Sequence, residues 1–272
     1  GFPFRVKPCF RKGFMERNIL LTIEYDGSGF SGWQRQPGRR TVQGELERVL
    51  SRLCACDILI NGTSRTDAGV HALGQRASFK GEFGIPTERI MRAANNLLAG
   101  GQNSQSAVGD VRITEVREMP LGFHARFDSK GKTYRYIIRN CPDVDVFKRR
   151  YCYQVQKPLD TDKMRQAAGF IVGTHDFKCF QAAGGNERLT TVRTIHRLDI
   201  HRQEENVIIE VTGDGFLYNM VRIITGTLVE VGLGKKQPGD IAGIIEKGDR
   251  QNAGHTAPAE GLYLVRVYYE NF

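Results

Sequence analysis

The sequence predicts an α+β protein made of two similar halves. Two observations lead to this fold class. Short segments alternate apolar and polar residues, as strands do, and longer segments repeat apolar residues every three or four positions, as helices do. These segments follow the order strand, helix, strands, helix, strand, and the chain runs through that order twice.

In the first half, the alternating pattern of strands covers residues 19–25, 58–60, 75–80 and 111–116. A helix is expected directly after Thr41, whose hydroxyl suits the N-cap position. A second helix is expected after Pro86, where apolar residues recur at helical spacing up to Leu98. A loop rich in glycine and serine, residues 26–33, joins the first strand to the first helix.

In the second half, strand patterns cover residues 132–139, 192–201, 206–212 and 262–269. A helix is expected to begin at Asp160 or Thr161. A long apolar helix is expected over residues 216–231, and a short helix over residues 240–247 is expected to end at Gly248.

This repeated order is that of a ferredoxin-like split βαβ unit. We therefore expect two pseudo-symmetric ferredoxin-like halves, residues 15–120 and 121–272, with mainly antiparallel sheets and a cleft between them. Residues 1–14 hold four basic residues and no acidic one. We expect them to be an N-terminal extension outside the fold; the alternative is a short basic arm that touches a partner.

Composition restricts the class of protein. The chain has 39 basic and 30 acidic residues, a net charge of +9, which favours a polyanionic partner without identifying one. No apolar run reaches the roughly 18 residues that a membrane span needs, so no membrane association is expected.

The six cysteines lack C-x-x-C spacing. We expect buried or free thiols and a cytoplasmic location.

Residues 64–72, Ser-Arg-Thr-Asp-Ala-Gly-Val-His-Ala, carry the strongest candidate for chemistry. Asp67 is expected in a sharp turn, because Gly69 allows positive φ and Ala68 leaves space beside the carboxylate. Arg65 can hold a phosphate or fill the gap that a displaced base leaves. For Asp67 alone, a role in forming the turn is the commoner explanation.

Two residues of the second half are further candidates. Arg222 lies in an expected apolar helix, where its guanidinium either reaches the surface or pairs with a carboxylate such as Asp67. Tyr134 lies in a strand with Lys132 and Arg135. Its ring either packs within the fold or offers a stacking surface for a base.

Several site types lack their required residues. The glycine-rich loop at 26–33 matches neither a P-loop nor a dinucleotide fingerprint. The six histidines form no HExxH motif or convincing metal-ligand set. No Gly-x-Ser-x-Gly elbow and no second acid in comparable context are present.

Together these motifs resemble the TruA-type tRNA pseudouridine synthase family over residues 18–270. Residues 64–72 resemble its catalytic motif. The other matching blocks are Tyr25-Asp26-Gly27, residues 32–36 (Gly-Trp-Gln-Arg-Gln), residues 41–47, residues 123–126 (Phe-His-Ala-Arg), residues 173–177, residues 216–222 and residues 257–264. Many members of the family have glycine where this chain has Ser64, and residues 99–110 look longer than the usual turn.

The resemblance implies an isomerase that converts uridine to pseudouridine at positions 38, 39 and 40 of the tRNA anticodon stem-loop. It implies no cofactor, no metal and a homodimer. Asp67 corresponds to the catalytic aspartate, Tyr134 to the tyrosine packed on the uracil, and Arg222 to the arginine paired with the aspartate. Arg65 corresponds to the arginine that assists nucleotide flipping. Lys132 and Arg35 are further candidates for RNA binding.

Three hypotheses remain at this point. The first is the RNA-modifying isomerase, with Asp67 acting as a nucleophile or as a general base. The second is a non-catalytic RNA-binding or tRNA-chaperone protein on the same fold. The third is a hydrolase that uses Asp67 with His71, which would need a second acid or base converging on Asp67.

Overall fold

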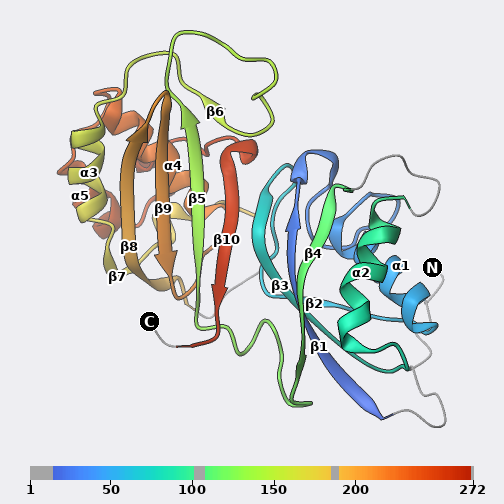
Figure 1. Cartoon of the computed structure of the whole chain (residues 1–272). Helices are drawn as coiled ribbons and strands as arrows, with labels where there is room; N and C mark the ends of the chain where they lie inside the picture. The colour runs from blue at the N-terminus through green and yellow to red at the C-terminus, as the bar shows by residue number, and fades with distance from the viewer. Residues whose placement is uncertain (1–14, 101–107, 185–189, 271–272) are drawn as a thin grey trace. The chain divides into compact units, whose positions relative to one another are not determined.

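The computed structural model divides the chain into two compact units, Gly1–Ser129 and Lys130–Phe272 (Figure 1). The structure describes residues 15–100, 108–184 and 190–270. The expected extension at 1–14 and most of the loop expected at 99–110 lie outside these residues. None of the described helices combines the length and apolar character that crossing a membrane requires.

The first unit contains four strands and two helices among its described residues. They are β1 (Glu16–Tyr25), α1 (Val42–Cys54), β2 (Asn61–Gly62), β3 (His71–Glu82), α2 (Thr87–Leu98) and β4 (Val111–Met119). The strands lie in the order β4-β1-β3-β2, and all neighbours are antiparallel. Both helices lie on one face of this sheet (Figure 1). The order is that of a ferredoxin-like fold.

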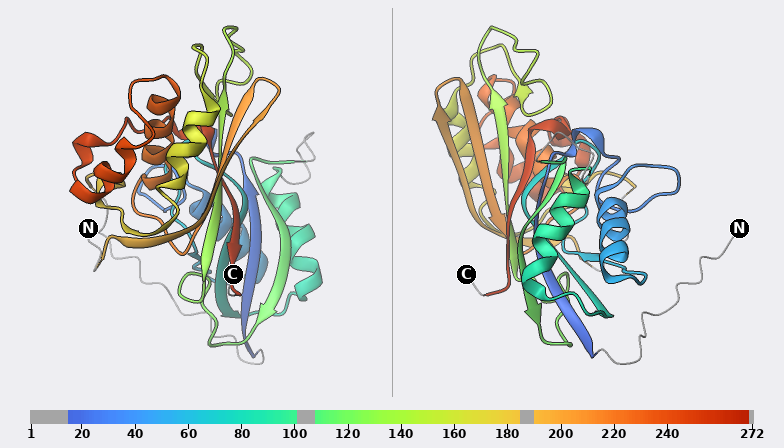
Figure 2. Two further views of the ribbon diagram at one scale, coloured as in Figure 1. Left: turned by 90° about the vertical axis from the view of Figure 1, so that its left-hand side faces the viewer. Right: turned by 45° about the vertical axis from the view of Figure 1, so that its right-hand side comes forward.

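The second unit repeats this arrangement and adds to it. Its described helices and strands are β5 (Gly131–Arg139), β6 (Tyr153–Gln154), α3 (Thr161–Gly169), β7 (Gly173–Asp176), β8 (Val192–Gln203), β9 (Asn206–Gly213), α4 (Met220–Gly232), α5 (Asp240–Lys247) and β10 (Leu262–Tyr268). The antiparallel order β10-β5-β9-β8 is equivalent to β4-β1-β3-β2, and β7 extends it beyond β8. The three α-helices lie on one face of the sheet (Figure 2).

Short elements complete both units. β6 pairs with β5 in parallel. Single turns of 3-10 helix are formed by Gly27–Gly29, Lys178–Phe180, Arg250–Asn252 and Ala259–Gly261. The predicted α+β class with mainly antiparallel strands is therefore confirmed.

Local signals explain where several helices begin and end. The hydroxyl of Thr41 accepts a hydrogen bond from the N–H of Gly44 at 3.3 Å and caps α1. The carboxylate of Asp160 caps α3 by accepting from Asp162 and Lys163. Gly248 ends α5 in the left-handed conformation, with φ at 64°. These ends satisfy backbone groups that a helix leaves unpaired.

Several boundaries differ from the sequence prediction. Residues 58–60 are not a strand, because the N–H groups of Ile58 and Ile60 bond to the side chains of Ser51 and Glu47 on α1. β3 begins at 71 rather than 75. α4 begins at Met220 rather than 216, because Asn219 has φ at 59°, a left-handed conformation that a continuing helix excludes.

The cysteines follow the expectation in part. Cys54, Cys141, Cys152 and Cys179 are free. Burial raises the pKa of Cys54 and of Cys179 to about 11, so both stay as neutral thiols near pH 7. Cys56, in contrast, is disulfide-bonded, and the expectation of free or buried thiols is wrong at this position.

Candidate active site

Asp67 lies in the connection between β2 and β3, residues 63–70. The N–H of Val70 donates to the carbonyl oxygen of Asp67 at 3.2 Å and closes a tight turn. Gly69 has φ at 80°, which this turn requires and which favours glycine. Asp67 is half-buried, whereas Arg65 and Ala68 on either side are exposed. The turn therefore presents the carboxylate at the surface of the first unit.

The loop at 26–33 lies directly against this turn. A Cβ on Gly27 would stand 2.0 Å from the carbonyl oxygen of Val70, and one on Gly32 would stand 2.7 Å from that of Thr66. The N–H of Trp33 also donates to the carbonyl oxygen of Thr66 at 3.0 Å. The glycines of this loop thus serve close backbone approach. The sequence had suggested only that the loop is not a phosphate cradle, and its support of Asp67 was missed.

Buried side chains hold the other end of the connection. Gln75 on β3, fully buried, donates from Nε2 to the carbonyl oxygen of Ser64 at 2.7 Å and accepts from its N–H at 3.3 Å. The hydroxyls of Tyr25 and Thr66 lie 2.7 Å apart in the interior. Both contacts fix the backbone on the N-terminal side of Asp67.

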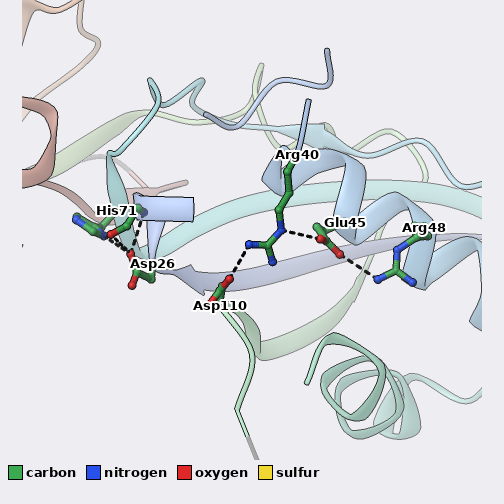
Figure 3. Close-up of polar contacts among 7 residues, drawn as sticks. Asp26, Arg40, Glu45, Arg48, His71 and Asp110 are labelled. Carbon is green, nitrogen blue, oxygen red and sulfur yellow. Dashed lines mark hydrogen bonds and ion pairs between the residues drawn. The ribbon is translucent and has the colours of Figure 1, made fainter. Parts of the chain in front are cut away.

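His71 ties the turn to the glycine-rich loop. The N–H of Gly27 donates to its Nδ1 at 3.1 Å, and the same atom lies 3.3 Å from Oδ1 of Asp26 (Figure 3). The ring is 2 % exposed. These contacts give His71 a structural role.

A chain of ion pairs fixes the outer side of the glycine-rich loop (Figure 3). Arg40 bonds to Asp110 at 2.7 Å and to Glu45 at 3.0 Å, and Arg48 bonds to the other oxygen of Glu45. The guanidinium of Arg40 also covers the ring of Phe30 at 4.2 Å. Burial acts to raise the pKa of Glu45, but the hydrogen bonds from Arg48 and Arg40 outweigh it and lower this pKa.

The second unit holds the other predicted residues. Lys132 and Tyr134 are two residues apart on β5 and so point to the same face of the strand. Tyr134 is 8 % exposed and packs edge-on against Phe216, with ring centroids 5.1 Å apart. Arg135 points to the opposite face and pairs with Glu210 on β9 at 2.8 Å. Tyr134 therefore shares its face of β5 with Lys132 but not with Arg135.

Arg222 lies in the first turn of α4. Its Nε donates to the carbonyl oxygen of Ala257 at 2.7 Å, and its Nη1 donates to Oδ1 of Asn219 at 2.9 Å. Beside this segment, the hydroxyl of Tyr136 donates to the carbonyl oxygen of Pro258 at 2.6 Å, and burial raises the pKa of Tyr136 well above its ordinary value. The half-buried guanidinium of Arg222 is thus oriented from two sides.

Arg65 and Arg35 differ in how they are engaged. Arg35 pairs with Glu47 at 3.1 Å. Within the part of the chain that the structure describes, the guanidinium of Arg65 has neither a hydrogen bond nor an ion pair, and it borders a pocket of about 180 Å³ in the first unit. Arg65 is therefore available to an anionic ligand beside Asp67.

The residues fall into two groups. Asp67, Arg65 and Arg35 belong to the first unit, and Lys132, Tyr134 and Arg222 belong to the second. A half-buried carboxylate with an unengaged guanidinium two residues away suits chemistry on an anionic substrate. The pairing of Asp67 with Arg222 stays a prediction.

Comparison with known proteins adds independent information. The family model for tRNA pseudouridine synthase matches residues 21–128 and 167–270. The tRNA pseudouridine synthase A of Ruminiclostridium cellulolyticum is 48% identical over 93% of this chain and 100% of its own length. That of Acetivibrio thermocellus is 47% identical over the same shares. A solved Cbf5-Nop10-Gar1 complex aligns over 90% of this chain and 56% of its own, with a TM-score of 0.31 and 10% identity, too low a likeness to carry an argument.

Both relatives are covered along their whole length, and the family model matches the segments that carry Asp67 and Arg222. The resemblance seen in the sequence motifs is thereby confirmed. The chain belongs to the tRNA pseudouridine synthase family, the isomerases that convert uridine to pseudouridine in tRNA.

Proposed function

We propose that this protein forms pseudouridine at positions 38, 39 and 40 of the tRNA anticodon stem-loop, with Asp67 as the catalytic carboxylate. One observation carries the assignment of Asp67. The turn that presents it is held by close backbone contacts from Gly27 and Gly32 on one side and by buried Gln75 on the other. Such preorganisation keeps a reacting group at a fixed distance from its substrate.

The reaction requires the uracil to detach, rotate and rejoin the sugar through carbon, so the uridine must leave the stacked helix. Asp67 then acts on it in one of two ways. It attacks as a nucleophile, or it removes a sugar proton as a general base. Both routes need an ionised carboxylate, and Arg65 stands two residues away to hold a phosphate or to assist flipping of the nucleotide.

Tyr134 and Arg222 complete the proposed site. We assign Tyr134 to packing against the target uracil, and Arg222 to an ion pair that keeps Asp67 ionised. The support for Arg222 is its orientation by Asn219 and Ala257. Lys132 and Arg35 are proposed to contact the RNA backbone, and the working form is proposed to be a cytoplasmic homodimer.

The test is to incubate unmodified tRNA carrying uridine at positions 38, 39 and 40 with the purified protein and to map pseudouridine. We expect it at those positions with the unaltered protein and not with Asp67→Ala, while the affinity for tRNA persists. Product at other positions would overturn the positional assignment. An unaltered protein that binds tRNA without modifying it would favour a non-catalytic RNA-binding protein.

Arg222→Ala separates positioning from binding. Because Arg222 is assigned to the carboxylate rather than to phosphates, we expect the single-turnover rate to fall by about 10²-fold or more, with little change in the dissociation constant for tRNA. Arg35→Ala is the comparison, because Arg35, which pairs with buried Glu47, is proposed to contact the RNA backbone: it should weaken tRNA binding and leave the single-turnover rate at saturating tRNA unchanged. Weaker binding by Arg222→Ala at an unchanged rate would contradict the assignment.

A further inference from the structure

Arg65 borders a pocket whose other lining residues have no part in the chemistry proposed above. Its walls come from residues 33–34 with Gln43, from residues 60–62 with Arg65, and from His124, Arg126 and Phe127. All of these residues belong to the first unit. Among the described residues, no aspartate or glutamate lines the pocket. A cation would find no carboxylate there, so the ligand that it suits is neutral or anionic.

One wall of the pocket is aromatic and open. Phe127 is 77 % exposed, and its ring lies against that of His124 with centroids 4.2 Å apart and planes tilted by 34°. The ring of an exposed phenylalanine forms no hydrogen bonds with water, whereas the face of a nucleobase can stack on it. Nδ1 of His124 accepts from the N–H groups of Arg126 and Phe127, so the neutral ring carries its proton on Nε2 as a hydrogen-bond donor.

Hydrogen bonds from buried side chains hold the backbone next to this wall in place. The buried side chain of Asn18 donates to the carbonyl oxygen of Phe123 at 2.8 Å. The hydroxyl of Thr63 donates to the carbonyl oxygen of Ala125 at 3.0 Å, and the N–H of Ala125 donates to the hydroxyl of Ser78 at 3.1 Å. A ligand therefore meets a wall that is already ordered, which lowers the entropic cost of binding.

The rest of the lining offers polar groups of two kinds. Gln34 and Asn61 are exposed, and within the described residues their side-chain amides make no hydrogen bond. Neutral amides can pair with the edge of a base, because each offers both a donor and an acceptor. The second kind is the guanidinium of Arg65, which makes no hydrogen bond or ion pair within the described residues. A guanidinium suits a phosphate.

We propose that this pocket binds the base of an RNA nucleotide adjacent to the target uridine. The base stacks on Phe127, its edge meets Gln34 and Asn61, and its backbone phosphate lies at Arg65. The inference rests on the proposed function, because the ligand is the RNA that carries the target uridine. A bare phosphate would use Arg65 but would leave Phe127 and both amides without a role.

The test combines Phe127→Ala with abasic RNA. Stem-loop RNAs carry an abasic site at one position at a time on either side of the target uridine, and dissociation constants are measured for each. We expect Phe127→Ala to weaken binding of the intact RNA by about 5- to 150-fold, the range for loss of one stacked base. For one abasic position it should cause no further loss, because the base that it contacted is already missing.

Phe147→Ala is the matched control, because Phe147 is 84 % exposed and lies in the second unit. Binding by Phe127→Ala as tight as by Phe147→Ala, at an unchanged melting temperature, would overturn the inference. So would equal additional losses at every abasic position. If the unaltered protein neither binds nor modifies the RNA, both the proposed function and this inference are overturned. If the unaltered protein modifies the RNA normally and Phe127→Ala has no effect, only this inference is overturned.

Discussion

The connection between β2 and β3 in the first unit and that between β8 and β9 in the second occupy the same place in the repeated fold. β8 and β9 are joined by Glu204 and Glu205 alone, with φ of Glu204 at 52°. β2 and β3 are separated by residues 63–70, which include Asp67. The same topology thus carries a minimal turn in one half and an elaborated turn in the other.

The two connections are stabilised differently. β8 pairs with β9 along most of its length, from Gln203 back to Ile195, so the ladder itself holds the turn. β2 pairs with β3 at only two positions. The first unit replaces the missing ladder with the side chain of Gln75 and with close contacts from Gly27 and Gly32. The turn around Asp67 is therefore held by a second segment of the chain rather than by a strand ladder.

Apart from changes to Asp67 itself, the largest effect is expected from Gly27→Ala, which displaces that second segment. The new methyl group would meet the carbonyl oxygen of Val70 at 2.0 Å, so either the loop or the turn must move. We expect a loss of stability of about 1–3 kcal/mol and a fall in turnover of about 10²-fold, measured by thermal unfolding and by pseudouridine formation.

Gly169→Ala in the second unit is the control for this change, since no atom lies within 4 Å of the added methyl group. It should leave the turnover number unchanged. A normal turnover number for Gly27→Ala would show that the glycine-rich loop does not hold Asp67.

A smaller effect is expected from Glu45→Gln, which weakens the outer support of the same loop. The pKa of Glu45 is lowered from 4.5, so its ionised form stabilises the folded protein above about pH 4.5, and this contribution is lost as the pH falls through the lowered pKa. The variant should lose about 0.5–1 kcal/mol near pH 7. The difference from the unaltered protein should shrink in acid, as measured by urea unfolding; a constant difference would contradict the assignment.

The smallest effect is expected from Glu204→Gly in the minimal turn. The left-handed conformation of Glu204 costs about 1 kcal/mol, and glycine removes this cost. The greater conformational entropy that glycine loses on folding offsets part of the resulting gain in stability. We expect stability to rise by roughly 0.5 kcal/mol with no change in pseudouridine formation. A clear loss of activity would mean that the β8–β9 turn also serves the reaction.

Local signals in the sequence predicted much of this fold. The caps at Thr41, Asp160 and Gly248 were predicted because each depends on one residue and its immediate neighbours. The start of α4 was missed because a left-handed Asn219 leaves no mark in an apolar run. Residues 58–60 alternate like a strand, but they bond to α1 rather than to a sheet.

The candidate site was predicted in the same uneven way. The turn around Asp67 could be predicted because Gly69 follows two residues later, within reach of local reasoning. The contact of Gly27 with Val70 joins segments that are distant in the sequence, and no spacing rule anticipates it. Strand alternation also places Arg135 on the face of β5 opposite Tyr134, although the two residues are neighbours in the sequence.

The most direct test of the central claim is the single-turnover rate of pseudouridine formation by Asp67→Asn, which keeps the size of the side chain and removes its charge. Glu204→Gln, at the carboxylate of the equivalent turn, is the matched control. We predict that Asp67→Asn reduces the rate by at least about 10²–10⁴-fold, while Glu204→Gln reacts at the rate of the unaltered protein. A rate for Asp67→Asn equal to that of the unaltered protein would contradict the account.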